Sequence, residues 1–202
     1  MSDKPDLSAL LGSRICHDLI SPIGAISNGV ELLMMDGKSS SPELSLIVDS
    51  VANATARIRF FRVAFGAPGA PGASEHRIAR AEVVNILGDL TRGARLSMDW
   101  QSPTDLSRRE VKLAFLAILC LESAMPHGGT LLIERGESRW TLRGDAARLR
   151  IDPDLWELLS NPAAHVDIGP AQVHFALLRD EIVRQHRRLS VEVSETVVRL
   201  SY

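Results

Sequence analysis

The first 66 residues carry two long apolar stripes, and these constrain the fold more than any other feature of the chain. In each stripe the apolar residues recur at intervals of three or four, a spacing that lines them up along one side of an α-helix. The first stripe comprises Leu11, Ile15, Leu19, Ile23, Ile26, Val30 and Leu33, and the second comprises Leu44, Ile47, Val51, Ala54, Ile58, Phe61 and Phe65. The pattern predicts two helices with a coiled-coil-like seam.

A short polar segment separates the two predicted helices. Asp36-Gly37-Lys38-Ser39-Ser40 breaks the pattern, Ser41 suits an N-cap, Pro42 suits the first helical position, and Glu43 suits the positive helix start. We therefore expect a helical hairpin over residues 1–66. Two helices alone bury little apolar surface, so the hairpin is expected to pair with a second copy in a homodimeric four-helix bundle.

The rest of the chain predicts a second domain. Gly66 to Ser74 reads G-A-P-G-A-P-G-A-S, which indicates a linker over residues 67–76. Residues 77–202 alternate helical and strand patterns, and Ser107 with Glu110 fits a capping box. Helices are expected over 81–90, 107–125, 153–159 and 170–187, and strands over 95–100, 130–135, 139–143, 189–194 and 197–202. This order favours an α+β chain whose second domain is an α/β sandwich, a sheet covered on one face by helices.

Composition narrows the function classes. The formal net charge of -2 and the aromatic content of 4% do not favour nucleic-acid binding. No run approaches 18 apolar residues, so we expect a cytoplasmic protein without a membrane span. Cys16 and Cys120 lie in apolar helical patterns and are expected to be buried free thiols. Five histidines show no metal-ligand spacing and are interpreted as ordinary surface or core residues: His76, His127, His165, His174 and His186.

The sixth histidine, His17, is expected to face solvent. At about 100° per residue, the centre of the 19/23/26/30/33 stripe lies about 200° from His17 around the helix. The residues near its own direction are Leu10, Ser13, Arg14, Ser21, Gly24, Asn28 and Glu31, several of them small or polar. The wheel therefore predicts an exposed imidazole on a patch that another protein can approach closely.

The residues that follow His17 suit phosphoryl chemistry. An imidazole is a good nucleophile near neutral pH. Asp18 can accept the N–H of one ring nitrogen and leave the other free to attack phosphorus, while Ser21, one turn on, can hydrogen-bond a phosphoryl oxygen or position a water. Pro22 falls inside the predicted helix, where a proline removes one backbone donor, bends the helix and costs about 3 kcal/mol. Because this proline lies five residues after an exposed histidine, the cost favours a functional role for the segment over a chance occurrence.

The run H-D-L-I-S-P-I-G-A-I resembles the phosphoacceptor H-box of sensor histidine kinases, typically H-E-L-R-T-P-L-x-x-I. It departs at Ile20, where kinases usually carry arginine; the matches are His17, Leu19, Pro22 and Ile26, with conservative replacements at Asp18, Ser21 and Ile23. The longer segments R-I-C-H-D-L-I-S-P-I-G-A-I-S-N-G-V-E-L-L and F-F-R-V-A-F-G resemble the ChpT-type histidine phosphotransferases. This resemblance is specific over residues 12–66 and extends over nearly the whole chain.

The resemblance implies a second domain similar to a degenerate kinase ATPase domain. The stretch from Leu119 to Ala124 reads L-C-L-E-S-A where kinases carry the N-x-x-x-N-A motif that helps to hold magnesium. No D-x-G-x-G motif occurs, and the segment from Ile168 to Val173 has one glycine where kinases have a second glycine-rich segment. We therefore expect no nucleotide site, no bound ATP and no metal ligands in this chain.

The implied function is a phosphorelay step in cell-cycle regulation. His17 would take a phosphoryl group from a receiver phosphoaspartate and pass it to an aspartate of a response regulator, with Mg²⁺ held by the receiver. The family implies a hybrid kinase such as CckA as donor and receivers such as CtrA and CpdR as acceptors. We expect receivers to dock on Arg14, Ile20, Gly24, Asn28 and Glu31. Two alternatives stay open: a divergent ATP-using sensor kinase, and a dimeric scaffold that binds receivers without chemistry.

Overall fold

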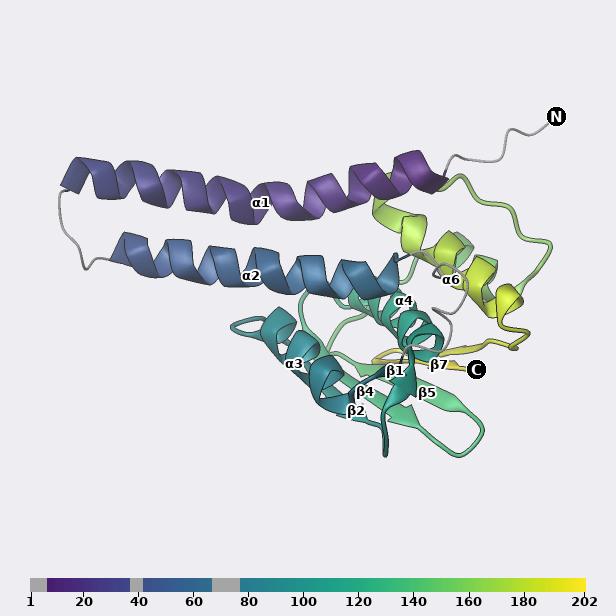
Figure 1. Cartoon of the computed structure of the whole chain (residues 1–202). Helices are drawn as coiled ribbons and strands as arrows, with labels where there is room; N and C mark the ends of the chain where they lie inside the picture. The colour runs from purple at the N-terminus through teal and green to yellow at the C-terminus, as the bar shows by residue number, and fades with distance from the viewer. Residues whose placement is uncertain (1–6, 37–41, 67–76) are drawn as a thin grey trace.

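The computed structural model describes residues 7–36, 42–66 and 77–202, and in it a helical hairpin lies across a helix-covered sheet (Figure 1). The hairpin consists of α1 (Leu7–Asp36) and α2 (Pro42–Ala64), which confirms the two predicted helices. The predicted turn with its Ser41 cap and the predicted linker over 67–76 lie outside the described residues.

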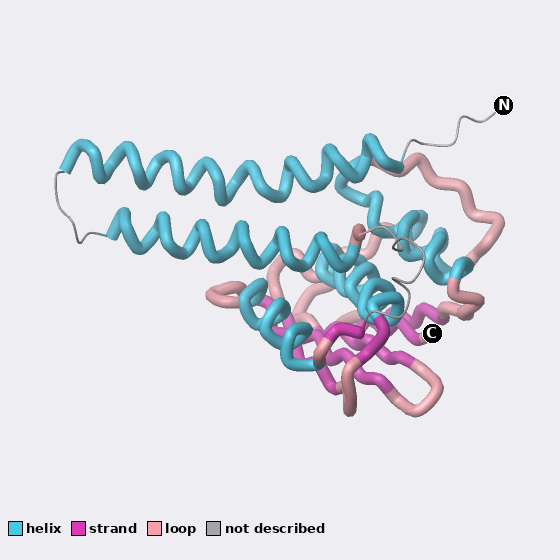
Figure 2. The backbone as a smooth tube through the Cα atoms, in the orientation of Figure 1, coloured by secondary structure: helices cyan, strands magenta, loops and turns pink. Residues whose placement is uncertain are grey.

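The second part of the chain is a layer of helices on one face of a five-stranded sheet (Figure 2). The strand order is β2-β4-β5-β7-β6, with β2 and β4 parallel and the other neighbours antiparallel. The elements are β1 (Arg77–Ile78), α3 (Arg80–Thr91), β2 (Leu96–Gln101), β3 (Leu106–Ser107), α4 (Arg108–Ala124), β4 (Gly129–Arg135), β5 (Trp140–Asp145), α5 (Pro153–Ser160), α6 (Val173–Arg184), β6 (Ser190–Val193) and β7 (Val197–Ser201). The α+β prediction is confirmed.

Helix α4 is the centre of the core. Its start is fixed by the predicted capping box, because the Ser107 hydroxyl accepts a hydrogen bond from the Glu110 backbone N–H over 3.3 Å. Below it, β4 and β5 turn alternate side chains toward the helices, among them the buried Leu131 and Ile133 of β4. The partly exposed residues between them face away, as is typical of a sheet with one solvated side.

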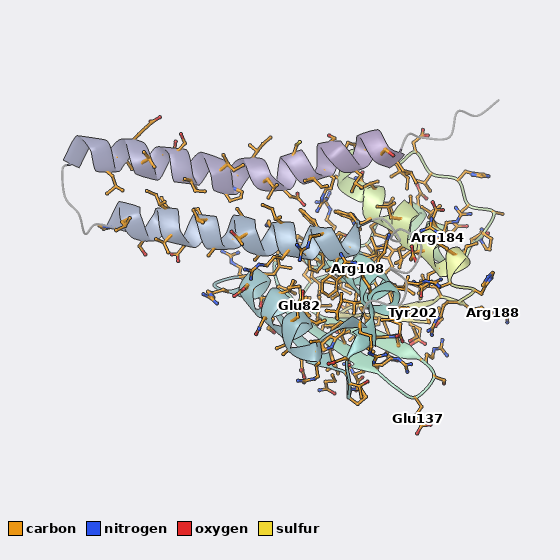
Figure 3. All side chains as sticks on the ribbon, in the orientation of Figure 1. Glu82, Arg108, Glu137, Arg184, Arg188 and Tyr202 are labelled. Carbon is orange, nitrogen blue, oxygen red and sulfur yellow. The ribbon has the colours of Figure 1, made fainter. Side chains whose placement is uncertain are left out.

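Helix α2 belongs to this core as well as to the hairpin. The rings of Phe60 and Phe115 stack with centroids 4.4 Å apart, and both side chains are buried. At the junction of α2 and α4, Arg108 donates to the backbone carbonyl of Arg62 over 2.8 Å (Figure 3). Truncating a buried Phe typically destabilises a protein by about 3–5 kcal/mol. The hairpin is therefore held in a defined position on the second domain.

The apolar seam of the hairpin differs from the prediction. In α1 the most buried positions are Pro22 and Gly29, whereas Ile23 and Val30 of the predicted stripe are 57% and 43% exposed. In α2 the predicted Leu44, Val51 and Ile58 are 40–53% exposed. The predicted stripe thus contains two kinds of residue in each helix. Some pack partly inside the hairpin, and the others are exposed to solvent. We call Ile23, Val30, Leu44, Val51 and Ile58 the open stripe.

Two further expectations were wrong, and one pair of strands was not predicted. The predicted helix 170–187 is a 3₁₀ turn over Pro170–Gln172 followed by a shorter α6, because Gln172 departs from helical dihedral angles. The strands β1 and β3 pair with each other and were not foreseen, since two residues carry no periodicity. Cys120 is buried, which raises the pKa of its thiol well above the ordinary value, but Cys16 is exposed because it lies on the open side of α1.

Candidate functional site

His17 lies in the first half of α1 with its side chain 84% exposed, as the helical wheel predicted. Its Nδ1 atom is 3.2 Å from Oδ1 of Asp18. With its proton on Nδ1, the ring donates to this carboxylate and leaves the lone pair of Nε2 free. A neutral imidazole in that tautomer can act as a nucleophile through Nε2.

The carboxylate of Asp18 is held from its other side. Its side chain is only 8% exposed, and its Oδ2 accepts a hydrogen bond from Nε of Arg14 over 2.8 Å. The Nη1 atom of Arg57, from α2, lies 4.0 Å from the same oxygen. The two carboxylate oxygens thus have separate partners, Oδ1 the histidine and Oδ2 the arginines.

The side of α1 that carries His17 is open. Ser21 is exposed one turn beyond the histidine, and Ile20 is 67% exposed. Gly24 is exposed, and a Cβ atom built there meets no other atom within 4 Å. Asn28 and Glu31 extend this exposed surface along the helix. A partner can therefore approach the helix backbone closely next to the imidazole.

Arg14 does not lie on this surface in the way we expected. Its side chain is 20% exposed, and besides Asp18 its guanidinium donates from Nη1 to the backbone carbonyl of Ala171 over 2.7 Å. Both contacts are within the chain. A part in receiver docking stays a prediction for Arg14, but its geometry is that of an internal bridge.

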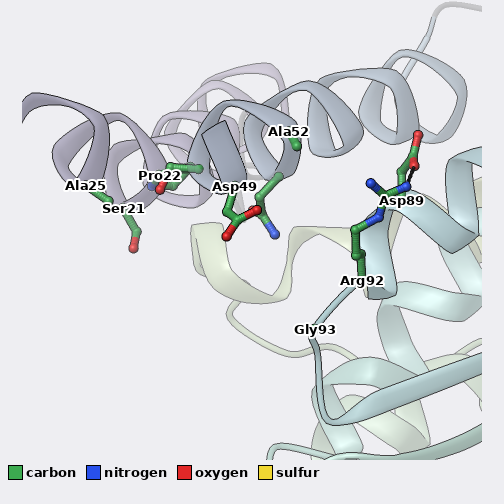
Figure 4. A pocket seen from close by; sticks show the side chains of 10 residues that line it. Ser21, Pro22, Ala25, Asp49, Ala52, Asp89, Arg92 and Gly93 are labelled. Carbon is green, nitrogen blue, oxygen red and sulfur yellow. Dashed lines mark hydrogen bonds and ion pairs between the residues drawn. The ribbon is translucent and has the colours of Figure 1, made fainter. Parts of the chain in front are cut away.

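A groove of about 510 Å³ begins one turn from His17 (Figure 4). Its walls come from α1, α2 and the end of α3, and they comprise Ser21, Pro22, Ala25, Asp49, Ser50, Ala52, Asn53, Asp89, Arg92 and Gly93. The α3 wall is fixed by charge pairs, since Asp89 accepts from Arg92 over 2.7 Å and lies 3.7 Å from Arg59. The second domain therefore contributes one wall of the groove that begins at Ser21, which no local sequence pattern indicated.

The stretch that we aligned with the magnesium-binding motif of kinases is buried at Leu119, Cys120, Leu121 and Ala124, whereas Ser123 is exposed. Leu119 is 5% exposed, and the hydroxyl of Ser123 donates to the carbonyl of Cys120 over 2.7 Å. These are the two positions where kinases carry asparagine. Within the described ranges, no group of three or more His, Cys, Asp or Glu side chains is arranged to hold a metal ion.

Two titratable residues near the site were missed by the sequence analysis. Burial raises the pKa of Glu122 on α4, although Arg57 and Arg14 nearby oppose that shift. His174, at the start of α6, is 1% exposed, and neither of its ring nitrogens has a hydrogen-bond partner in the described part of the chain. Burial, together with the charge of Arg14, lowers the pKa of His174 to about 3. His127, His165 and His186 are exposed, and His76 lies outside the described residues.

Known proteins share both the sequence and the shape of this chain. The protein phosphotransferase ChpT of Brucella abortus (strain 2308) is 36% identical over 183 residues, which cover 87% of this chain and 86% of the relative. Residues 80–197 match the family described as the histidine phosphotransferase C-terminal domain. The chain belongs to the ChpT-type histidine phosphotransferases. A solved bacterial phosphotransferase is 31% identical and superposes with a TM-score of 0.80, covering 100% of this chain and 97% of the other.

A histidine kinase domain of the blue-light-activated kinase from Erythrobacter litoralis EL346 is a more distant neighbour, 12% identical with a TM-score of 0.46 over 94% of each chain. Among the helices in the described ranges, none is long and apolar enough to cross a membrane.

Proposed function

We propose that this phosphotransferase moves a phosphoryl group between two receiver domains through His17. The observation that carries the proposal is the exposed imidazole of His17 with its Nδ1 beside the fixed carboxylate of Asp18. In this arrangement the second nitrogen, Nε2, is both free and accessible.

The transfer consists of two in-line displacements. Nε2 attacks the phosphorus of an aspartyl phosphate, an N–P bond forms, and the P–O bond to the aspartyl carboxylate breaks with that carboxylate as leaving group. The proton on Nδ1 stays in place, so the ring becomes cationic, and the adjacent Asp18 stabilises it. In the second displacement an aspartate of another receiver attacks the phosphorus, and the neutral imidazole leaves.

Receivers would dock on the open side of α1. Ile20, Gly24, Asn28 and Glu31 form its surface, and the groove beside Ser21 would accommodate a protruding part of the receiver. Ser21 lies four residues after His17 on the same helix, a spacing that puts its hydroxyl within reach of a phosphoryl group on the ring. Mg²⁺ would come in the acidic pocket of the receiver. By family resemblance, the donor is the receiver of a CckA-like hybrid kinase, the acceptors are CtrA-like and CpdR-like regulators, and the reaction takes place in the cytoplasm.

We also propose that the hairpin forms a homodimer through the open stripe. Five apolar side chains at heptad spacing on two adjacent helices are 40–57% exposed. Exposed apolar side chains repeated at this spacing favour an interaction site, and a second hairpin would cover them as a four-helix bundle. In this division of roles residues 1–66 dimerise and carry the phosphoryl group, while residues 77–202 support the hairpin without using ATP.

Transfer between two receivers tests the proposal against both alternatives. The wild-type protein and a His17→Asn variant are each mixed with a phosphorylated receiver and then with a second, unphosphorylated receiver. We expect acid-labile phosphate on the wild type, its passage to the second receiver, and neither event with His17→Asn, although that variant still binds. Equal transfer by both proteins would contradict the role of His17. Binding without transfer by the wild type would favour the scaffold, and phosphorylation from ATP alone would favour the kinase.

A further inference from the structure

Arg14 connects the phosphoacceptor to a distant part of the chain. Its Nε donates to Oδ2 of Asp18 over 2.8 Å, and its Nη1 donates to the carbonyl of Ala171, 157 residues further on, over 2.7 Å. Ala171 lies in the 3₁₀ turn over Pro170–Gln172 that precedes α6. One guanidinium therefore joins the carboxylate beside His17 to the second domain.

The geometry of a guanidinium makes this bridge directional. Its nitrogens lie in one plane with fixed angles, so a bond at Nη1 also restricts where Nε points. The carboxylate of Asp18 is only 8% exposed and its bond to Arg14 is partly buried, whereas the bond from Arg14 to Ala171 lies nearer the surface. Arg57, 4.0 Å from Oδ2, adds positive charge on the same oxygen and leaves Oδ1 as the acceptor that faces His17.

We infer that Arg14 is a positioning residue for the phosphotransfer: held by the Ala171 carbonyl, it fixes Asp18 so that Oδ1 receives the Nδ1–H of His17. The inference rests on the proposed function, in which His17 is the acceptor. A neutral histidine places its single proton on either ring nitrogen, and only the Nδ1–H tautomer leaves Nε2 free to attack. The second domain thus acts on the chemistry through a backbone carbonyl, without a nucleotide.

A positioning role and a docking role for Arg14 predict different kinetics. If Arg14 orients Asp18, its loss slows transfer at saturating receiver and leaves the receiver concentration for half-maximal rate nearly unchanged. If Arg14 contacts the receiver, its loss raises that concentration and leaves the saturated rate unchanged.

The first test is the tautomer of His17, read by ¹⁵N NMR in the full-length protein without receiver. We expect the Nδ1–H form in the wild type and a shift toward Nε2–H in Arg14→Ala. Arg14→Lys should fall between them, because one ammonium cannot span both Asp18 and Ala171. The matched control is Arg199→Ala, which removes an ion pair with Glu192 on the far strands and should behave as wild type. An unchanged tautomer in Arg14→Ala would overturn the inference.

The second test is a double-mutant cycle of transfer rates at saturating receiver. Arg14→Ala should slow transfer about tenfold, the low end of the losses found when a residue that orients a metal-binding histidine is removed. In an Asp18→Asn background the same change should have no further effect, because Arg14 acts through Asp18. If the fold-changes of the two single variants multiplied in the double variant, Arg14 would act independently of Asp18 and the inference would be wrong. A wild type that never becomes phosphorylated, with the expected tautomer shift, would refute the proposed function and leave the positioning role standing.

Discussion

His174 should make the protein sensitive to mild acid. Its ring is buried, neither ring nitrogen has a hydrogen-bond partner among the described residues, and its pKa of about 3 lies below the ordinary 6.5. Because the pKa of His174 is lower in the folded state than in the unfolded state, the unfolded chain binds the proton more tightly. The free energy of unfolding is therefore highest above pH 6.5 and declines as the pH falls from 6.5 toward 3. The decline is about 1.4 kcal/mol per pH unit, or about 2 kcal/mol between pH 7 and pH 5.

Thermal unfolding at pH 7 and pH 5 measures this effect. For a chain of this size, 2 kcal/mol corresponds to a Tm lower by roughly 4–8 °C. His174→Leu should lose that part of the pH dependence and keep its stability at pH 7, because neither nitrogen gives up a bond. His165→Leu, at an exposed position, serves as the matched control and should lose stability as the wild type does. Equal losses of Tm in the wild type and in His174→Leu would refute the reasoning.

Three further predictions concern assembly, nucleotide and docking. Light scattering should give twice the 22.1 kDa chain mass for the wild type and for the control Val183→Glu, whose position is exposed on α6. Ile58→Glu places a charge on the open stripe and should give the single-chain mass, and a monomeric wild type would exclude the dimer. Mg-ATP should leave the Tm unchanged. A ligand at 100 times its Kd would raise the free energy of unfolding by about 2.7 kcal/mol, so a saturable rise in Tm would favour the kinase alternative. Gly24→Arg should abolish receiver binding in a titration by filling open space on α1, whereas Gly88→Arg, equally open on α3, should not; normal binding by Gly24→Arg would show that receivers dock elsewhere.

Most of the fold could be predicted because its elements carry local signals. The heptad spacing indicated α1 and α2, and the Ser107–Glu110 pair indicated the start of α4. The predicted seam was only partly correct. The periodicity locates the apolar side of each helix, but it does not show which of these residues pack within the hairpin and which stay exposed. That Phe60 of α2 stacks on Phe115 depends on tertiary packing, for which the sequence carries no short-range signal.

The same distinction holds for the candidate site. The exposure of His17 followed from the helical wheel, and its contact with Asp18 was expected because the two residues are adjacent in the sequence. The bond from Arg14 to Ala171 and the burial of His174 could not be predicted, since both depend on how α6 meets α1 across a long separation in sequence. The wheel placed Arg14 correctly near His17 but could not show that its guanidinium is already engaged inside the chain.

The atom that carries the phosphoryl group tests the central claim most directly. The protein, labelled with ¹⁵N at histidine, is phosphorylated by a phosphorylated receiver, separated from it, and observed by ³¹P and ¹⁵N NMR. We predict one phosphorus signal coupled to Nε2 of His17, absent in His17→Asn and lost when a second receiver is added. Phosphorus bonded to any other residue, or a phosphoryl group that stays on the protein in the presence of a competent second receiver, would contradict the account.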